Sequence, residues 1–336
     1  MATTRILLVD NGSLRPEATL ALRRLSAEVA QLLGQPVHPV SVLHSHKIDR
    51  ALLAGEPAII FEQAVRQAKA DGIAELIVLP LFIGPSLALT EYLPKVFAEA
   101  FPGAMKLTIR PTLFGEDGDG LRRILMENLH EAGWDPDLDT ILLCDHGSPV
   151  PEVTACRDAL ARDLAAELNH GSKRVHPVIA CSMERREGKE YAFNEPLLET
   201  ALGQLKGNAI ILMLFALPGR HAGPGGDVET IARTHAPESA QVRISPLLSN
   251  AKHGMLADLI ARHSGLPPRT PTRDWRFWLD VGFTCIGFAA MGMLTVQAFE
   301  NGLLDGLTGK IAIAAGVAVI AFLGYVAFAS RRPDGR

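Results

Sequence analysis

Along residues 1–266, short apolar runs alternate with amphipathic stretches, a pattern that predicts parallel strands joined by crossover helices. The runs are almost continuously aliphatic, as in strands that helices cover on both faces of a sheet. We expect strands at Arg5–Val9, Val37–Leu43, Glu75–Leu81, Lys106–Arg110, Thr140–Cys144, Arg174–Cys181, Ala209–Phe215 and Gln241–Ile244. Helices are expected between them, for example at Glu17–Leu33, Ala58–Ala70, Glu152–Leu168 and Pro196–Leu205.

The pattern of the first half recurs in the second half. The octet that begins at Ile6 returns 135 residues later at Ile141, with His146 in the place of Asn11. Further segments match in the same order: Pro16-Glu17 with Pro151-Glu152, Val37-His38-Pro39-Val40 with Val175-His176-Pro177-Val178, and Leu79-Pro80-Leu81-Phe82 with Leu212-Met213-Leu214-Phe215. We therefore predict two tandem α/β lobes, residues 1–133 and 134–266, with parallel sheets flanked by helices.

The apolar surplus of the chain lies near its C-terminal end. Residues 281–299 and 311–330 contain 19 and 20 residues without a charged side chain, and each stretch is long enough to cross a membrane as a helix. We predict a linker rich in proline and arginine at 267–276, a transmembrane hairpin at 277–330 and a tail at 331–336. A buried hairpin in a soluble domain is the alternative, but both stretches lack the polar stripe of a globular helix.

Charge sets the expected orientation and excludes one class of partner. Arginines flank the predicted hairpin on both sides, so the positive-inside rule predicts that the lobes and the tail are cytoplasmic. Such an anchor would keep the lobes near a partner in the same membrane. The net charge of −4 gives no reason to expect a nucleic-acid partner. No export signal precedes the first apolar run, and the four cysteines form no CxxC pair, so reduced thiols are expected.

Three side chains with metal-binding chemistry follow three predicted strands of the second lobe. His146 follows the first of these strands, Glu184 the second and His221 the third. Ligands of open parallel sheets bind at the carboxyl ends of the strands, and two imidazoles with a carboxylate suit Co, Fe, Ni or Zn. The alternatives without metal chemistry are a helix-capping turn at His146 and a solvent-exposed run of charged residues at Glu184. By our alignment the first lobe lacks two of the three groups, since it offers Asn11, His46 and Ala88.

The loop around His221 is rich in glycine and carries one arginine. Gly219 and Gly223 leave backbone N–H groups open to a flat or bulky anionic ligand, and Arg220 can pair with a ligand carboxylate. An ordinary surface loop is the alternative. A histidine phosphatase is a weaker hypothesis for Arg220-His221, because that chemistry expects Arg-His-Gly near the first strand.

Together these motifs resemble the sirohydrochlorin chelatases, which are class II tetrapyrrole chelatases of the cobalamin and siroheme pathways. The resemblance rests on the Leu-Leu-x-x-His-Gly-Ser start, the glutamate after the second strand and the Pro-Leu-Phe…His segment, and it covers residues 1–266. It implies that His146 and His221 are the metal-site histidines and that Glu184 is their acidic partner. The first lobe departs from the family pattern at both histidine positions, so one active site is expected.

The resemblance implies a lyase that inserts Co²⁺ or Fe²⁺ into sirohydrochlorin or a related tetrapyrrole. The metal is then a substrate, and no permanently bound cofactor is expected. A neutral imidazole can bind the metal or accept the pyrrole protons at cellular pH. The ligand types leave cobalt and iron open. The competing hypothesis is a membrane-tethered protein that binds metal or tetrapyrrole without turnover.

Overall fold

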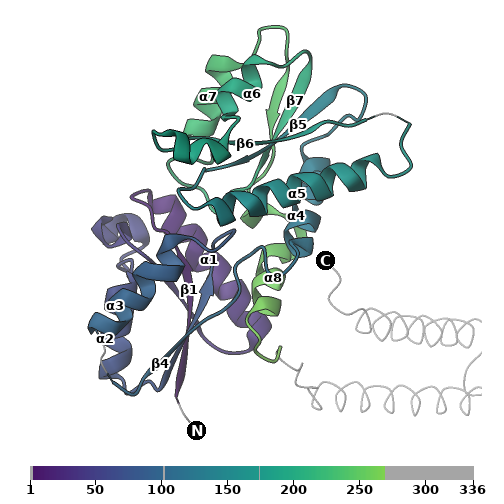
Figure 1. The fold of residues 1–336 in the computed structure, drawn as a ribbon. Coiled ribbons are helices and arrows are strands. Elements are labelled where there is room, and N and C mark those ends of the chain that lie inside the picture. Colours follow the sequence, from purple (N-terminus) through teal and green to yellow (C-terminus); the bar gives the residue numbers. More distant parts are fainter. Residues whose placement is uncertain (1–2, 101–102, 174, 269–336) are drawn as a thin grey trace, which may run out of the picture. The chain divides into compact units, whose positions relative to one another are not determined.

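The computed structural model describes residues 3–100, 103–173 and 175–268 (Figure 1). They form two four-stranded sheets in which every pairing is parallel, with the strand orders β2-β1-β3-β4 and β6-β5-β7-β8. The predicted fold class, two tandem parallel α/β lobes, is confirmed for these residues. The strands are β1 (Thr4–Asp10), β2 (Val37–Ser41), β3 (Glu75–Pro80), β4 (Lys106–Ile109), β5 (Asp139–Asp145), β6 (Val178–Ser182), β7 (Asn208–Met213) and β8 (Val242–Ile244).

Helices connect the strands, and the first long helix of each lobe begins in the same way. Pro16 and Pro151 stand at the first helical turn, where a missing N–H costs nothing, and Glu17 and Glu152 follow them. The helices are α1 (Pro16–Leu33), α2 (Phe61–Ala70), α3 (Leu93–Ala100), α4 (Asp119–Glu131), α5 (Pro151–Asn169), α6 (Leu198–Gly203), α7 (Asp227–His235) and α8 (Met255–His263).

The hydrophobic core has one part that both lobes share and two parts that belong to one lobe each. The shared cluster joins side chains of β1, β3, β5 and β7 to α1, α4, α5 and α8. A second cluster packs the other face of the first sheet against α2 and α3. A third packs the other face of the second sheet against α6 and α7. Each sheet is therefore covered on both faces, which explains its almost continuously aliphatic strands.

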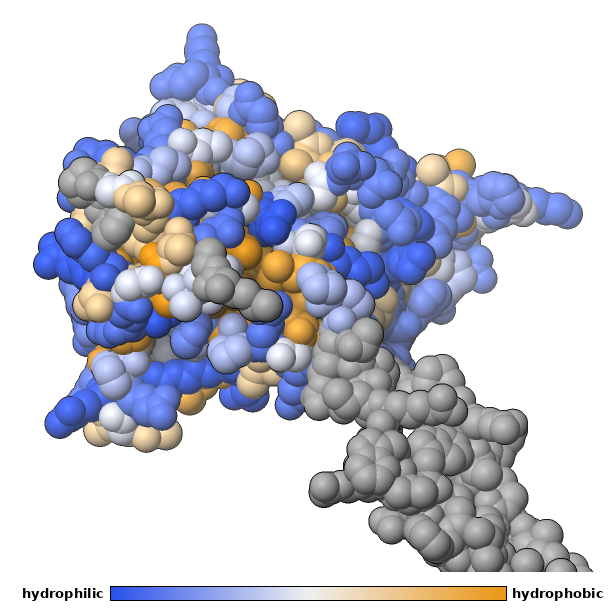
Figure 2. All heavy atoms as spheres, turned by 90° about the horizontal axis from the view of Figure 1, so that it is seen from below, coloured by the Kyte–Doolittle hydropathy of each residue, from blue (hydrophilic) through white to orange (hydrophobic). Residues whose placement is uncertain are grey.

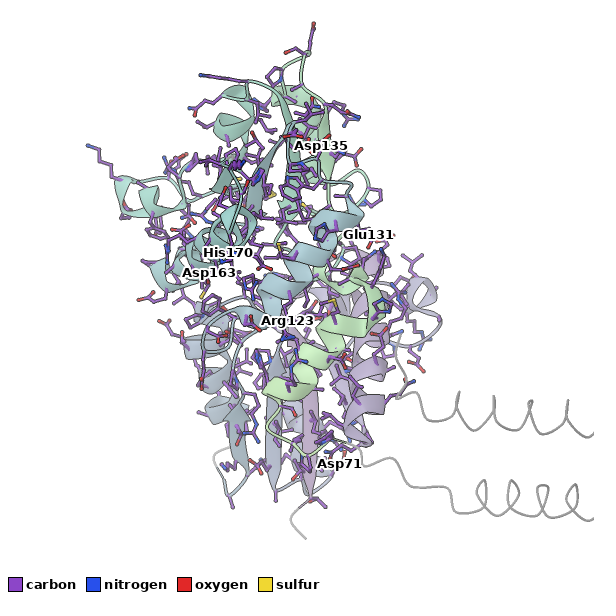
Figure 3. All side chains as sticks on the ribbon, turned by 90° about the vertical axis from the view of Figure 1, so that its right-hand side faces the viewer. Asp71, Arg123, Glu131, Asp135, Asp163 and His170 are labelled. Atoms are coloured by element: carbon purple, nitrogen blue, oxygen red, sulfur yellow. The ribbon has the colours of Figure 1, made fainter. Side chains whose placement is uncertain are left out.

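Two helices connect the lobes. Helix α4, which the sequence assigns to the first lobe, packs against β7 and α5 of the second. Helix α8, from the end of the second lobe, packs against α1 of the first and against α4. Figure 3, in which Arg123 marks α4, shows α4 beside α8. Both sheets accordingly belong to one compact unit, and the predicted lobe boundary at residue 133 stays a prediction.

The second strand of the second lobe begins later than predicted. The prediction began it at residue 174, and the alignment of the lobes matched Val37 with Val175. In the structure, Val178 pairs with Ile141 in the way that Val37 pairs with Ile6. Pro177, just before β6, has no N–H to donate to a neighbouring strand. The lobes therefore align with Val37 at the place of Val178, and the sequence match was wrong by three residues.

Two predicted helices also begin later than expected. Ile60 precedes α2 in extended conformation and bridges to Ser41 at the end of β2. Leu197 precedes α6 and bridges to Ser182 at the end of β6 in the same way. The residues before both helices prolong the sheet edge, so the helices begin only at Phe61 and Leu198.

The predicted linker, transmembrane hairpin and tail lie outside the described residues, apart from the first two linker residues, 267 and 268. Among the described helices, none is both long and apolar enough to span a membrane. Seen from below the view of Figure 1, hydrophilic side chains dominate the surface, with hydrophobic ones in small groups between them (Figure 2).

Candidate active site

The main cleft lies between the two lobes, where the loops after the first and third strands of both sheets meet. Its volume is about 1360 Å³, and loops that follow β1, β2, β3, β5, β6 and β7 line it. Around the cleft the lobes touch directly. A Cβ added at Gly84 would lie 3.0 Å from Cys156 Sγ of the second lobe, and Gly219 lies beside Ser13 of the first. The cleft is therefore a composite of both halves of the chain.

The three residues that the sequence singles out come together in this cleft. The imidazole centroids of His146 and His221 lie 4.6 Å apart, with the rings edge to face. His146 Nε2 lies 3.4 Å from Glu184 Oε1. All three side chains are accessible from the cleft, since the exposed fractions are 46%, 58% and 30% for His146, Glu184 and His221. The predicted juxtaposition exists, and the roles of the three residues stay predictions.

Hydrogen bonds set the proton positions on the two imidazoles. His221 Nδ1 lies 2.8 Å from Asp227 Oδ2, so Nδ1 carries the proton and donates it to the carboxylate. His146 Nδ1 lies 3.1 Å from the carbonyl oxygen of Gly147, which can only accept a hydrogen bond. Each ring therefore keeps the lone pair of Nε2 for a metal ion or for a proton. Carboxylate support of this kind is typical of metal-binding histidines.

A buried polar network holds the loop that carries His146. Arg157, which is 1% exposed, donates to Ser182 Oγ at 2.5 Å and lies 3.6 Å from Asp145 Oδ1. Ser182 in turn donates to Asp145 at 2.6 Å. Asn194 both accepts from and donates to the backbone of Ser148, at 3.0 and 2.9 Å. Burial raises the pKa of Asp145, while Arg157 acts against this rise.

Two equivalent glycines show which residue of the first lobe corresponds to Glu184. Gly12 and Gly147 have φ values of +90° and +91°, which favour glycine. An added Cβ would lie 1.9 Å from the carbonyl oxygen of Leu43 in the first case and of Glu184 in the second. Leu43 is therefore the counterpart of Glu184, and the prediction that His46 takes this place is wrong.

The predicted anion-binding residues are only partly brought together. Gly219 and Arg220 line the cleft, and the Arg220 side chain is 75% exposed, with Nε 3.6 Å from Asp227 Oδ2. Gly223 lines a smaller neighbouring pocket instead. Arg185 also lines the cleft, but it donates to Glu195 Oε1 at 2.7 Å. Arg220 is thus the more available of these two arginines.

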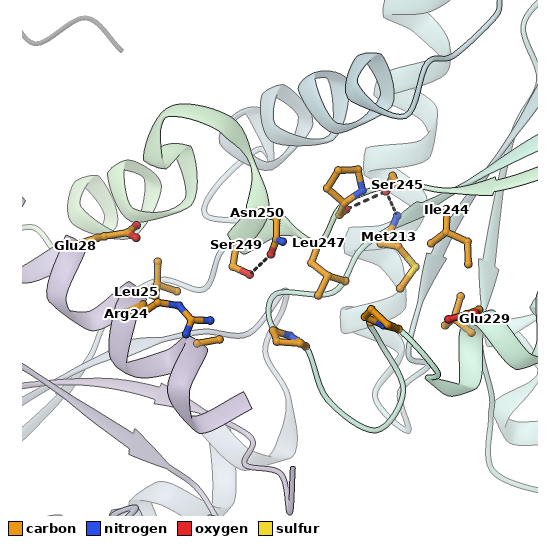
Figure 4. A pocket seen from close by; sticks show the side chains of 16 residues that line it. Arg24, Leu25, Glu28, Met213, Glu229, Ile244, Ser245, Leu247, Ser249 and Asn250 are labelled. Atoms are coloured by element: carbon orange, nitrogen blue, oxygen red, sulfur yellow. Dashed lines mark hydrogen bonds between the residues drawn. The ribbon is translucent and has the colours of Figure 1, made fainter. Parts of the chain in front are cut away.

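The smaller pocket, of about 780 Å³, borders the same glycine-rich loop (Figure 4). Helix α1 contributes Arg24 and Glu28, and the segment after β8 contributes Ser249 and Asn250, which are hydrogen-bonded to each other at 3.1 Å. The two histidines and Glu184 line the main cleft and not this pocket. We therefore place the candidate chemistry in the main cleft.

Within the described ranges, no group of three or more His, Cys, Asp or Glu side chains is arranged closely enough to hold a metal ion. The His146–Glu184–His221 set is therefore close to a ligand set without being a closed one. Cys144 and Cys181 are buried free thiols, and the hydrogen bond between them together with burial raises the pKa of Cys144.

Sequence reasoning missed three residues that position the site. Asp227 follows His221 by six residues and was left without a role, although an acidic residue near a candidate ligand is a usable signal. Arg157 stands in the helix after the His146 loop, and Asn194 lies far along the chain. Only the fold brings Arg157 and Asn194 beside the strand ends, so no local pattern could have identified them.

No family model and no curated protein matches the chain, but solved structures do. SirB from Bacillus subtilis, solved with Fe³⁺, matches with a TM-score of 0.51 at 16% identity, over 78% of this chain and 94% of that one. CbiX, the terminal enzyme of siroheme biosynthesis in denitrifying bacteria, matches with a TM-score of 0.52 at 19% identity, over 79% and 100%. The sirohydrochlorin chelatase SirB from Bacillus subtilis subspecies spizizenii, in complex with cobalt, matches with a TM-score of 0.52 at 14% identity, over 78% and 94%. The chain therefore has a fold similar to that of the sirohydrochlorin chelatases.

Proposed function

We propose that this protein inserts a divalent metal ion, Co²⁺ or Fe²⁺, into sirohydrochlorin or a related tetrapyrrole. The observation that carries the proposal is the meeting of His146, Glu184 and His221 at the strand ends of one lobe, inside a cleft between two lobes. The cleft of about 1360 Å³ exceeds the volume of ordinary small-molecule pockets, as a macrocyclic substrate requires. The similarity to solved sirohydrochlorin chelatases supports the same activity.

The metal ion is a substrate in this proposal, and the two histidines are its first protein ligands. Nε2 of His146 and Nε2 of His221 both keep a lone pair, because Nδ1 of each ring donates elsewhere. Glu184 beside His146 supplies an anionic oxygen that balances part of the charge of the ion. Imidazole with carboxylate suits both Co²⁺ and Fe²⁺, so the choice of metal follows supply.

Insertion also requires the removal of two protons from the pyrrole nitrogens of the ring. A neutral imidazole can take such a proton once its Nε2 is no longer bound to the metal. Asp227 would stabilise the resulting imidazolium of His221, because its carboxylate already accepts from Nδ1 at 2.8 Å. Glu184 can receive the proton from His146 across 3.4 Å and pass it to solvent, since its side chain is 58% exposed.

The carboxylates of the tetrapyrrole require cations at the rim of the cleft. Arg220 is 75% exposed and presents a planar fork that suits a carboxylate. The backbone at Gly219 is the neighbouring part of the same wall. The N–H of Gly219 already donates to the carbonyl oxygen of Ala222 at 2.8 Å, so we assign the holding of substrate carboxylates to Arg220.

Membrane attachment is a separate part of the proposal. The uncharged stretches 281–299 and 311–330 support an anchor with both flanks in the cytoplasm. The anchor would keep the enzyme near a membrane partner that supplies metal or takes the product.

An anaerobic assay of the full-length protein with metal-free sirohydrochlorin and Co²⁺ or Fe²⁺ tests the activity. Absorbance follows metallation, with the tetrapyrrole in large excess over the protein. We expect many turnovers per chain, at a rate well above that of the reaction without protein. If metallation stops at one equivalent per chain, the protein is a binding protein without turnover, which is the competing hypothesis. If the metallation rate equals the protein-free rate, the chelatase proposal is wrong.

A further inference from the structure

The wall that the first lobe gives to the cleft differs in chemistry from the wall of the second lobe. Strands β3 and β7 occupy equivalent places in their sheets, and at equal distances beyond them the chain has Leu87-Ala88 in one lobe and Arg220-His221 in the other. Both pairs line the cleft. The first lobe thus presents aliphatic side chains where the second presents a cation and a metal-binding imidazole.

Two leucines of this wall are exposed to solvent inside the cleft. Leu14 is 63% exposed and Leu87 is 41% exposed, and both line the cleft together with the half-buried Phe82, Ile83 and Ala88. Single exposed leucines are ordinary, but several apolar side chains along the wall of one concave site mark a ligand surface. We call these five residues the aliphatic wall.

The charged residues of the cleft lie mostly on the other lobe. Arg185, Arg186 and Arg220 come from the second lobe, and Arg15 is the cation that the first lobe adds beside Leu14. A ligand that fits this division has a broad apolar face and several anionic groups at its edge. A tetrapyrrole with peripheral carboxylates has both.

We propose that the aliphatic wall binds the flat face of the tetrapyrrole ring, while the second lobe handles the metal and the carboxylates. The inference rests on the proposed function and deepens it, because it assigns a substrate-binding role to the lobe without metal ligands. The first lobe then needs no histidine at the positions of Asn11 and Ala88, since its contribution is apolar contact area with the ring. Burial of each exposed leucine under the ring stabilises the complex through the apolar area removed from water.

The test measures tetrapyrrole binding and metal binding separately on the full-length protein. In Leu14→Asn and Leu87→Asn a polar group of similar size replaces each leucine without adding charge. Titration with metal-free sirohydrochlorin, followed by fluorescence, should give a Kd about tenfold higher for each variant and higher still for the double variant. Co²⁺ binding in the absence of tetrapyrrole and the thermal midpoint should match the wild type.

Matched controls come from exposed leucines outside the cleft. The exposed fraction of Leu52, 60%, matches that of Leu14, and the exposed fraction of Leu32, 36%, is similar to that of Leu87. Leu52→Asn and Leu32→Asn should bind the tetrapyrrole as the wild type does. The double variant Leu14→Met and Leu87→Met should bind the tetrapyrrole as the wild type does, since methionine offers a comparable apolar surface.

Two outcomes separate this inference from the proposed function. If the wild type binds and metallates sirohydrochlorin and the double asparagine variant binds it equally well, the aliphatic wall does not contact the ring and the inference is wrong. If the wild type itself neither binds nor metallates sirohydrochlorin, the proposed function fails first. Equal weakening by the control variants would also overturn the inference, because the effect would not belong to the wall.

Discussion

The two lobes share a backbone plan but treat the aspartate at the end of the first strand differently. Asp10 ends β1 and Asp145 ends β5, and each approaches a serine on the adjacent strand, Ser41 or Ser182. In the second lobe Arg157 lies 3.6 Å from Asp145 and completes a buried network. At the same place of α1 the first lobe has only apolar Leu22.

This difference leaves the Asp10 carboxyl group with hydrogen bonds but without the arginine that Asp145 has. Asp10 Oδ1 is buried and finds no hydrogen-bond partner within the part of the chain that the structure describes. Burial raises the pKa of Asp10 to about 6. The buried arginine network is thus present in the lobe that carries His146, where it holds the loop that positions this histidine.

The largest expected effect separates the two lobes by activity. His221→Ala should lower the metallation rate at least about 100-fold, because it removes a metal ligand and a proton acceptor together. Asn11→Ala, at the place of His146, should stay within a few-fold of the wild type. The anaerobic absorbance assay measures both variants. Equal losses in the two would mean that the lobes are not functionally different.

The next effect concerns the buried arginine. Arg157→Leu copies the first lobe and leaves Asp145 without its cation, so the free energy of unfolding should fall by about 3–5 kcal/mol. Urea unfolding measures it. Adding Asp145→Asn should recover part of the loss, because no buried charge is then left unpaired. A single variant as stable as the wild type would show that the network has no stabilising role.

Asp227 offers a smaller effect that reports on His221. Asp227→Asn should lower the metallation rate by about 10- to 100-fold, since the carboxylate accepts from Nδ1 of His221 and fixes the tautomer and orientation of the imidazole. The anaerobic absorbance assay measures this variant. A rate within a few-fold of the wild type would contradict the positioning role of Asp227.

The smallest effect is a pH-dependent gain in stability for Asp10→Asn. The unfolded carboxyl group ionises near its ordinary pKa of 3.8 and the folded one near 6, so between these pH values the folded state binds more protons. Wild-type stability therefore falls as the pH rises through this window, by up to about 3 kcal/mol. The unpaired amide donor of asparagine offsets much of this, so the variant should be more stable by about 1 kcal/mol near neutral pH.

Urea unfolding of the wild type and Asp10→Asn across the acidic range checks this expectation. The advantage of the variant should shrink as the pH falls through this window and should be lost or reversed below about pH 3, where the wild-type carboxyl group is protonated in both states. A difference that does not change with pH would contradict the raised pKa of Asp10.

The fold was predictable because its strands are short aliphatic runs and its lobes repeat. The same regularity placed His146, Glu184 and His221 at strand ends, where parallel topology brings them to one edge. The alignment of the lobes was wrong at the two Val-His-Pro-Val segments, because local sequence identity does not determine the register of a strand. Pairing with β1 and β5 sets the register, and it makes Leu43, not His46, the counterpart of Glu184.

Other features depend on tertiary packing that no local pattern records. The placement of α8 on the first lobe and of α4 on the second follows from the shared core. The Arg157 network joins a helix, a strand end and a distant loop. These contacts lie 25 to 46 residues apart in the sequence, beyond the reach of periodicity and spacing.

The most direct test of the difference between the lobes is the stoichiometry of Co²⁺ binding to the full-length protein at equilibrium. We predict one ion per chain, unchanged in Asn11→Ala and lost when His146→Ala and His221→Ala are combined. Two equivalent ions per chain, or one ion that persists in the double histidine variant, would contradict a single metal site in the second lobe.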